Sequence, residues 1–78
     1  MKRDQIEAVV RAVLSKVLKH EVHQECSREN TPDWDSLKHI AVVFAIEDEL
    51  GIQFPEDEIS KLDSVARIVD VAESLYAT

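Results

Sequence analysis

The sequence predicts an all-α protein, a small four-helix bundle with three longer helices and one short third helix. Apolar residues recur at the spacing of an amphipathic helix over most of the chain, and no segment shows the alternation of a strand. The chain holds one glycine and two prolines among its 78 residues, whereas a sheet protein would need more turn residues. This length fits a single domain, residues 1–78.

The first helix is predicted from about Asp4 to His20. Asp4 with Glu7 resembles a capping box in which Asp replaces the usual Ser or Thr. Valine is a mediocre helix former, so burial must supply much of this helix's stability. The apolar stripe expected to face the core consists of Ile6, Val9, Val10, Val13, Leu14, Val17 and Leu18.

Residues 21–35 break the helical period and are predicted to form a long loop. Turn-forming residues gather here, and Pro32 disfavours helix on both sides. We expect Val22 and Trp34 to anchor the loop to the bundle, with the Trp34 ring packed and its N–H exposed. Loops of this length are often either functional or disordered.

The second helix is predicted from about Ser36 to Leu50, with Asp35 as its N-cap and Gly51 as its stop. A helix that is apolar on most sides is either central in a bundle or used for docking. The expected apolar stripe is Leu37, Ile40, Val43, Phe44 and Leu50. Further apolar faces come from Ala41, Val42, Ala45 and Ile46.

A short third helix is predicted over Pro55–Leu62, with proline at its first position and three acidic residues in its first turn. Asp63 or Ser64 should cap the last helix, which runs to about Tyr76. The residues of this last helix expected to face inward are Val65, Ile68, Val69, Ala72 and Leu75.

The net charge is −7 and it is uneven along the chain. Residues 1–28 carry six basic and four acidic side chains, whereas residues 29–78 carry three basic and twelve acidic ones. This distribution argues against nucleic-acid binding and favours partners with basic docking surfaces, although acidity also simply keeps a small protein soluble.

The chain has no apolar run long enough to span a membrane and no signal-peptide pattern at its start. Its single cysteine, Cys26, cannot form an internal disulfide. We therefore expect a cytoplasmic protein with no membrane partner.

His20, His23 and Cys26 follow one another at intervals of three residues, a spacing that can bring ligands together on one helix face. Two alternatives follow. These residues could form a zinc site with Glu29 as a fourth ligand, or Cys26 could be a reactive thiol. Because the segment is loop-like and lacks a tight pair of cysteines, no metal is predicted.

Ser36 lies where the polar loop meets the apolar second helix. A hydroxyl here is exposed, held on a rigid helix end, and close to backbone N–H groups that favour anions. Ser36 is therefore either a helix cap or an attachment point for a phosphodiester.

Asp35-Ser36-Leu37 at the start of this helix resembles the Asp-Ser-Leu signature of acyl carrier proteins. The segment 45–58 resembles that family's acidic helix end, hydrophobic return and Pro-acid-acid helix, and the likeness extends over about 33–76. The resemblance implies an acyl-carrier-like bundle in which Ser36, flanked by Asp35 and Leu37, carries covalent 4′-phosphopantetheine. The arm would hold an acyl or aminoacyl group as a thioester, and the protein itself would not be an enzyme.

The resemblance also implies partners for a monomeric carrier. They are a phosphopantetheinyl transferase, a ligase that loads an acyl or aminoacyl group, and a downstream transferase or synthase. Leu37, Ile40 and Phe44 would lie partly in the core and partly around the base of the arm, while the acids near the helix end are either a docking ridge or a solvated face. The residues expected to contact partners are Leu37, Lys38, Ile40, Phe44, Glu47 and Asp48.

Two departures from the family pattern favour a free-standing carrier of a specialised pathway over a housekeeping fatty-acid carrier. Lys38 and Ala41 stand where the family often places acids, and Trp34 replaces a small residue common in fatty-acid carriers. The alternative function is an unmodified adaptor that binds a partner through its acidic helical face.

Overall fold

The computed structural model describes residues 2–77 and contains four helices and no strand within them. The helices are α1 (Arg3–Leu18), α2 (Ser36–Leu50), α3 (Glu56–Ile59) and α4 (Val65–Ala77). The all-α prediction, with three longer helices and a short third one, is confirmed. None of the described helices is both long and apolar enough to cross a membrane.

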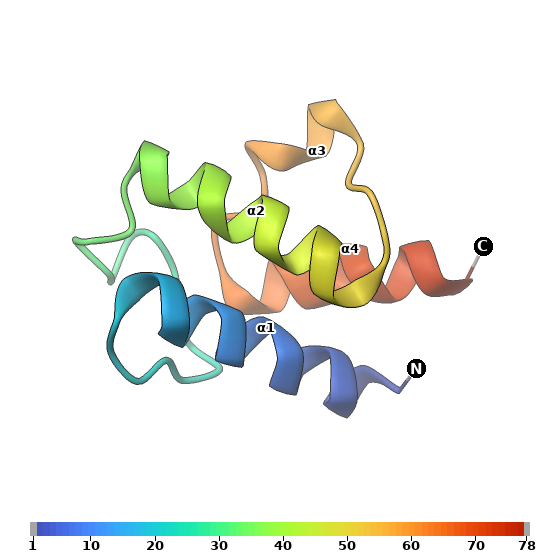
Figure 1. Ribbon diagram of the computed structural model, residues 1–78, viewed down its shortest axis with the longest axis horizontal. Coiled ribbons are helices and arrows are strands. Elements are labelled where there is room, and N and C mark those ends of the chain that lie inside the picture. Colours follow the sequence, from blue (N-terminus) through green and yellow to red (C-terminus); the bar gives the residue numbers. More distant parts are fainter. Residues whose placement is uncertain (1, 78) are drawn as a thin grey trace.

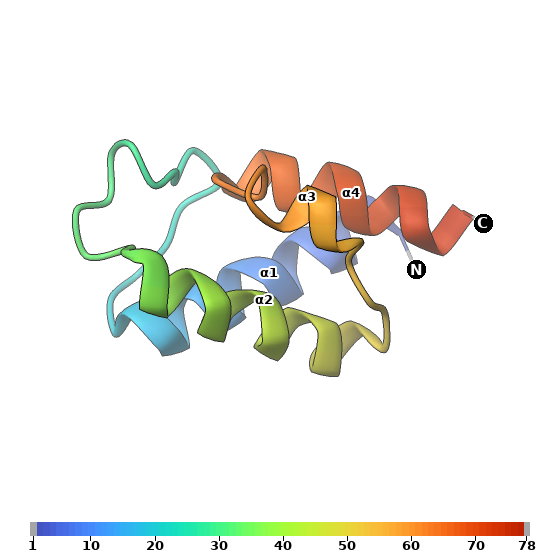
Figure 2. The ribbon, with the colours of Figure 1, turned by 90° about the horizontal axis from the view of Figure 1, so that it is seen from above.

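Helix α1 is the element that contacts both other long helices, α2 and α4. Figure 1 shows α1 along the lower side of the molecule and α3 on the opposite side, above α2 and α4. The long loop between α1 and α2 lies at the end of the molecule where α2 begins, and both termini lie at the other end (Figure 1, Figure 2). The long loop therefore lies next to the start of α2.

One hydrophobic core joins α1, α2, α4 and the connecting segments. The predicted stripe of α1 is confirmed, because Ile6, Val10 and Leu14 are fully buried and Val9 and Val17 pack at its edge. The two predicted loop anchors are also in the core. Its buried members are Ile6, Val10, Val13, Leu14, Leu18, Val22, Cys26, Trp34, Val42, Val43, Ile46, Leu50, Phe54, Leu62, Val65, Ile68, Val69 and Ala72.

The ends of α1 differ from the prediction. The helix ends at Leu18 because Lys19 adopts a left-handed backbone, with φ of 62°, so His20 lies outside it. The predicted capping box of Asp4 and Glu7 is wrong. At the N-terminal end of α1 the backbone N–H of Lys2 instead donates to the side chain of Gln5 over 3.0 Å, two residues earlier than expected.

The bounds of α2 are as predicted, with Asp35 as N-cap and Gly51 left-handed at φ 66°. The expectation that Leu37, Ile40 and Phe44 lie partly in the core is wrong, because all three side chains are exposed. The core side of α2 packs against α1 and instead consists of His39, Val42, Val43, Ile46 and Leu50.

The third helix is shorter than the predicted Pro55–Leu62, because only Glu56–Ile59 is helical. Pro55 is its N-cap, with an extended backbone, and not its first helical residue. The chain then leaves the helix in turns and reaches Ser64, whose hydroxyl accepts a hydrogen bond from the Arg67 N–H over 3.1 Å. Ser64 is therefore the cap of α4.

Backbone hydrogen bonds attach the long loop to the start of α4. The Arg28 N–H donates to the Asp63 carbonyl over 2.8 Å, and the Val65 N–H donates to the Cys26 carbonyl over 3.0 Å. These two bonds form an isolated antiparallel bridge between Ser27 and Ser64. They fix the position of Arg28 relative to the bundle.

Candidate functional site

Ser36 is the first residue of α2 and is exposed. The side chain that caps the helix belongs to Asp35, whose carboxylate accepts from the Lys38 N–H over 2.9 Å. The Asp35 carbonyl accepts from the His39 N–H over 2.8 Å, which is the first bond of the helix. Because Asp35 is the cap, the alternative that Ser36 serves as the cap is wrong, and its hydroxyl stays outside the capping contacts.

The Trp34 side chain just before this motif is 2% exposed, and its N–H is buried too. The indole Nε1–H donates to Nδ1 of His39 over 3.1 Å, and the two rings lie 6.0 Å apart between centroids. The prediction that this N–H would be exposed is therefore wrong. A buried indole N–H needs an acceptor, and the imidazole one turn into α2 provides it.

His39 is 4% exposed and uses both ring nitrogens. An indole N–H can only donate, so Nδ1 of His39 is the acceptor and the proton lies on Nε2. Nε2 then donates to the Ile59 carbonyl over 2.8 Å. His39 in its neutral form thus joins the loop, α2 and α3 beside Ser36.

An open hollow of about 430 Å³ lies between the loop, α2 and α3, next to Ser36. Arg28 brings a cation to it, and its Nε donates to the Trp34 carbonyl over 3.3 Å. The hollow therefore combines the cation Arg28, the acid Glu56, hydroxyl groups and apolar surface at the start of α2. Its lining consists of Arg28, Ser36, His39, Ile40, Glu56, Ile59 and Ser60.

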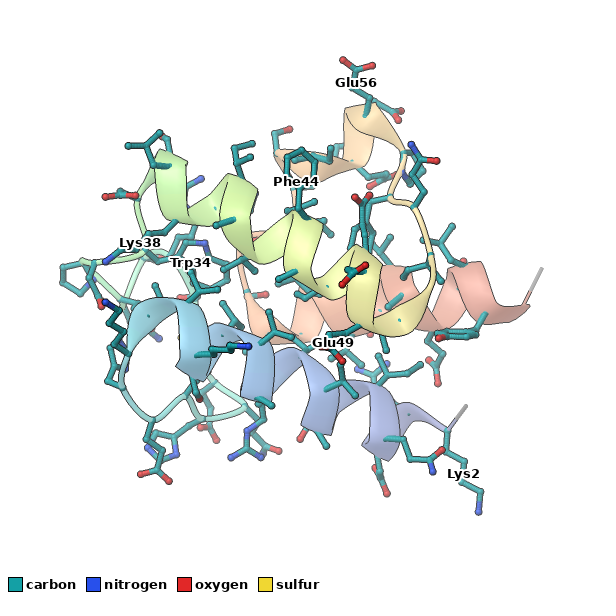
Figure 3. All side chains as sticks on the ribbon, viewed as in Figure 1. Lys2, Trp34, Lys38, Phe44, Glu49 and Glu56 are labelled. Carbon is teal, nitrogen blue, oxygen red and sulfur yellow. The ribbon has the colours of Figure 1, made fainter. Side chains whose placement is uncertain are left out.

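An exposed apolar strip runs along the outer face of α2. Leu37, Ile40 and Phe44 are 84%, 45% and 61% exposed, and their spacing of three and four residues places them on one side of the helix. Figure 3 shows Phe44 projecting from α2 on the side away from α1. These three residues form what we call the α2 strip, a surface available for contact with another molecule.

The remaining predicted partner residues lie at the two ends of the same helix. Lys38 is in the first turn, beside Ser36. Glu47 and Asp48 lie two to three turns after Lys38, roughly 14 Å away along the helix axis. Asp48 is exposed, but the Glu47 carboxylate accepts a hydrogen bond from the Phe54 N–H over 2.7 Å. Glu47 therefore makes a hydrogen bond within the fold, whereas Asp48 is an exposed acid.

Two of the residues considered for zinc, His20 and Cys26, have other partners. His20 Nε2 lies 3.0 Å from a carboxylate oxygen of Asp33, and the buried Cys26 thiol lies 3.0 Å from the Thr31 hydroxyl. No cluster of three or more His, Cys, Asp or Glu side chains within residues 2–77 could hold a metal ion.

No protein-family model matches this chain. The chemistry of the site must therefore be judged from its own residues. The His39 imidazole beside Ser36 does not serve as an activating base for this hydroxyl, because both of its nitrogens are engaged in hydrogen bonds. Sequence reasoning missed His39 and Arg28, and the only local signal was their polar character next to the motif.

Proposed function

We propose that this protein is an acyl-carrier-like protein that holds an acyl or aminoacyl group as a thioester on a 4′-phosphopantetheine arm attached to Ser36. The observation that supports this most is the exposed Ser36 hydroxyl at the start of α2, left free of capping by Asp35. A hydroxyl that the neighbouring imidazole does not activate suits modification by a separate enzyme that supplies the base. The family resemblance around residues 35–37 points to the same reaction.

The residues around Ser36 fit such an arm. Its phosphodiester is an anion, and it would lie near Arg28 and near the N-terminus of α2, both of which favour negative charge. Ile40 and Ile59 offer apolar surface in the same hollow. When attached, the arm supplies a terminal thiol for thioester formation, and this chain supplies the anchor and its surroundings.

The α2 strip supports contact with partner enzymes, which we propose to be a phosphopantetheinyl transferase, a loading ligase and a downstream transferase or synthase. Exposed Leu37 and Phe44 give an apolar surface beside the attachment point. Lys38 and Asp48 place opposite charges at the two ends of that surface. Such a charge pattern contributes more to specificity among partners than to affinity for any one of them. We propose a monomeric, cytoplasmic carrier of a specialised pathway.

The test is an intact-mass measurement after incubation with coenzyme A and a broad-specificity phosphopantetheinyl transferase. The wild type should gain one phosphopantetheine, and Ser36→Ala should gain none. Ser60→Ala is the matched control, because Ser60 lines the same hollow and should leave the modification intact. A mass gain in Ser36→Ala would overturn the proposal.

The α2 strip also favours a second candidate function, an unmodified adaptor. An exposed apolar face on a helix suits a protein partner whether or not an arm is present. The adaptor would bind its partner equally well with Ser36 or with Ser36→Ala. A carrier would lose every transfer reaction in that variant, so the same variant separates the two functions.

A further inference from the structure

Helix α3 is held weakly by its own side chains. It has four residues, none of which is buried, and it spans the gap between the buried anchors Phe54 and Leu62. Its last carbonyl, that of Ile59, accepts the 2.8 Å hydrogen bond from Nε2 of His39. This bond ties α3 directly to the first turn of α2, close to Ser36.

The bond network requires His39 to be neutral. Protonation would put a hydrogen on Nδ1, opposite the Nε1–H of Trp34, so that two donors would face each other in a buried contact. Both side chains are almost completely buried, and neither donor could turn to water without moving the ring. A protonated His39 must therefore give up the Trp34 contact. Where the imidazole ring turns to do so, Nε2 leaves the Ile59 carbonyl, because both nitrogens belong to one rigid ring.

The charged groups near His39 do not reverse this conclusion. Within residues 2–77, the charged side chains that line the hollow with His39 are Arg28 from the loop and Glu56 from α3, and the lining includes no residue of α1 or α4. Arg28 opposes a second positive charge and Glu56 favours it, so their effects are opposite in sign. On α2 itself, Lys38 is a further cation and the Asp35 carboxylate is bonded to the Lys38 N–H.

We infer that His39 is a proton-gated positioning residue: in its neutral form it holds α3 against α2 and shapes the hollow beside Ser36, and in its protonated form it releases α3. The gate itself follows from the contacts of Trp34, His39 and Ile59. Its consequence for an arm in the hollow rests on the proposed function.

The first test is NMR of the uniformly labelled full chain between about pH 7.5 and pH 5. At neutral pH the imidazole nitrogens of His39 should show the proton on Nε2. On acidification the Trp34 indole N–H resonance should shift. The Leu62 N–H, which donates to the Ile59 carbonyl over 3.2 Å, should lose protection from hydrogen exchange by about fivefold. If both signals stay constant over this pH range, the inference is wrong.

A variant that cannot titrate provides the control. In His39→Gln, the amide oxygen can accept from Trp34 and the amide nitrogen can donate to Ile59. Its indole and Leu62 signals should therefore not change with pH. His20→Gln and His23→Gln remove exposed histidines and should keep the wild-type response. If His39→Gln responds to pH as the wild type does, or if His20→Gln abolishes the response, His39 is not the gate.

The second test concerns the arm. The rate of phosphopantetheine transfer to wild type should be divided by the rate for His39→Gln at each pH, so that the enzyme's own pH dependence cancels. We expect this ratio to change at least twofold over the range in which the indole signal shifts. A constant ratio would overturn the link to the arm. If Ser36 is never modified, the proposed function fails while the NMR test of the gate still gives its answer.

Discussion

The carboxylate of Glu47 accepts a 2.7 Å hydrogen bond from the backbone N–H of Phe54. The Glu47 carbonyl meanwhile accepts from the N–H groups of both Gly51 and Ile52, which close the end of α2. One residue thus satisfies three backbone donors of the segment that leads from α2 to α3. Glu47, which was predicted to contact partners, therefore has a structural role at the end of α2.

Glu47→Ala should destabilise the protein by about 1.5–3 kcal/mol, because a hydrogen bond to a charged group is lost and the half-buried N–H of Phe54 is left without its acceptor. For a domain of this size, each kcal/mol corresponds to a fall of about 4–8 °C in melting temperature. Thermal unfolding followed by circular dichroism measures this change.

The matched control is Asp48→Ala, which removes an exposed acid next to Glu47 on the same helix. Its free energy of unfolding should stay within about 0.5 kcal/mol of wild type. Equal stability of the two variants would mean that the Glu47 contact adds nothing to the fold.

The cap of α2 gives the second prediction. Asp35→Ala should cost about 0.5–2 kcal/mol of stability, because the Lys38 N–H loses its acceptor at the helix end. Asp35→Asn keeps a side-chain oxygen and should lose less. Urea unfolding of the three proteins measures the difference. If Asp35→Asn is as unstable as Asp35→Ala, charge rather than capping is the source of the effect.

The ends of α2 could be predicted because their signals are local. Asp35 can bond to an N–H three residues on, and Gly51 can adopt the left-handed backbone that ends a helix. The stripe of α1 could be predicted for a similar reason, since only one of its faces is apolar. Ser36 and Asp35 were therefore placed correctly at the start of α2 from the sequence.

The buried side of α2 could not be predicted because this helix is apolar on most sides. Which face enters the core depends on the position of α1, a long-range property that the local pattern does not contain. His39 is polar and was not expected inside, yet it is buried because Trp34 and Ile59, five and twenty residues away, satisfy its two nitrogens. The hollow beside Ser36 likewise depends on a loop whose closure places Arg28 there.

Salt should stabilise this protein. The net charge is −7, and acids cluster in 47–49 and 56–58, so repulsion within the folded chain should be screened as salt rises. The ion pairs of Arg3 and Arg11 oppose this trend, but the first is exposed and the second is only half-buried, and ion pairs near the surface contribute little. We expect the melting temperature to rise as sodium chloride increases from about 0.02 to about 0.5 M. Over this range the screening length falls from above about 10 Å to below it.

A double variant tests the source of the salt effect. Asp48→Asn with Glu49→Gln removes two exposed acids of the first cluster and should reduce the rise in melting temperature with salt. A melting temperature that falls with salt in the wild type would mean that attractive ion pairs outweigh repulsion.

The last prediction concerns the α2 strip, where the effect of a substitution on stability can be separated from its effect on recognition by the transferase. Phe44→Ala should change stability by less than about 0.5 kcal/mol because its side chain is 61% exposed, whereas Ile46→Ala, two residues on and fully buried, should cost about 2–5 kcal/mol. If the strip binds the transferase, Phe44→Ala should nevertheless slow modification of Ser36 several-fold. Residual folded Ile46→Ala should be modified at the wild-type rate, since its side chain faces the core.

Salt distinguishes the apolar contact from the charges around it. Lys38→Asp should change the transfer rate mainly at low salt, because salt screens electrostatic steering by a charge at the surface. The Phe44→Ala defect should persist at high salt, because burial of an apolar ring does not depend on ionic strength in this way. If the Phe44→Ala rate equals that of wild type at both salt concentrations, the transferase does not bind this strip. Recognition would then have to begin from the loop and α3 around the hollow.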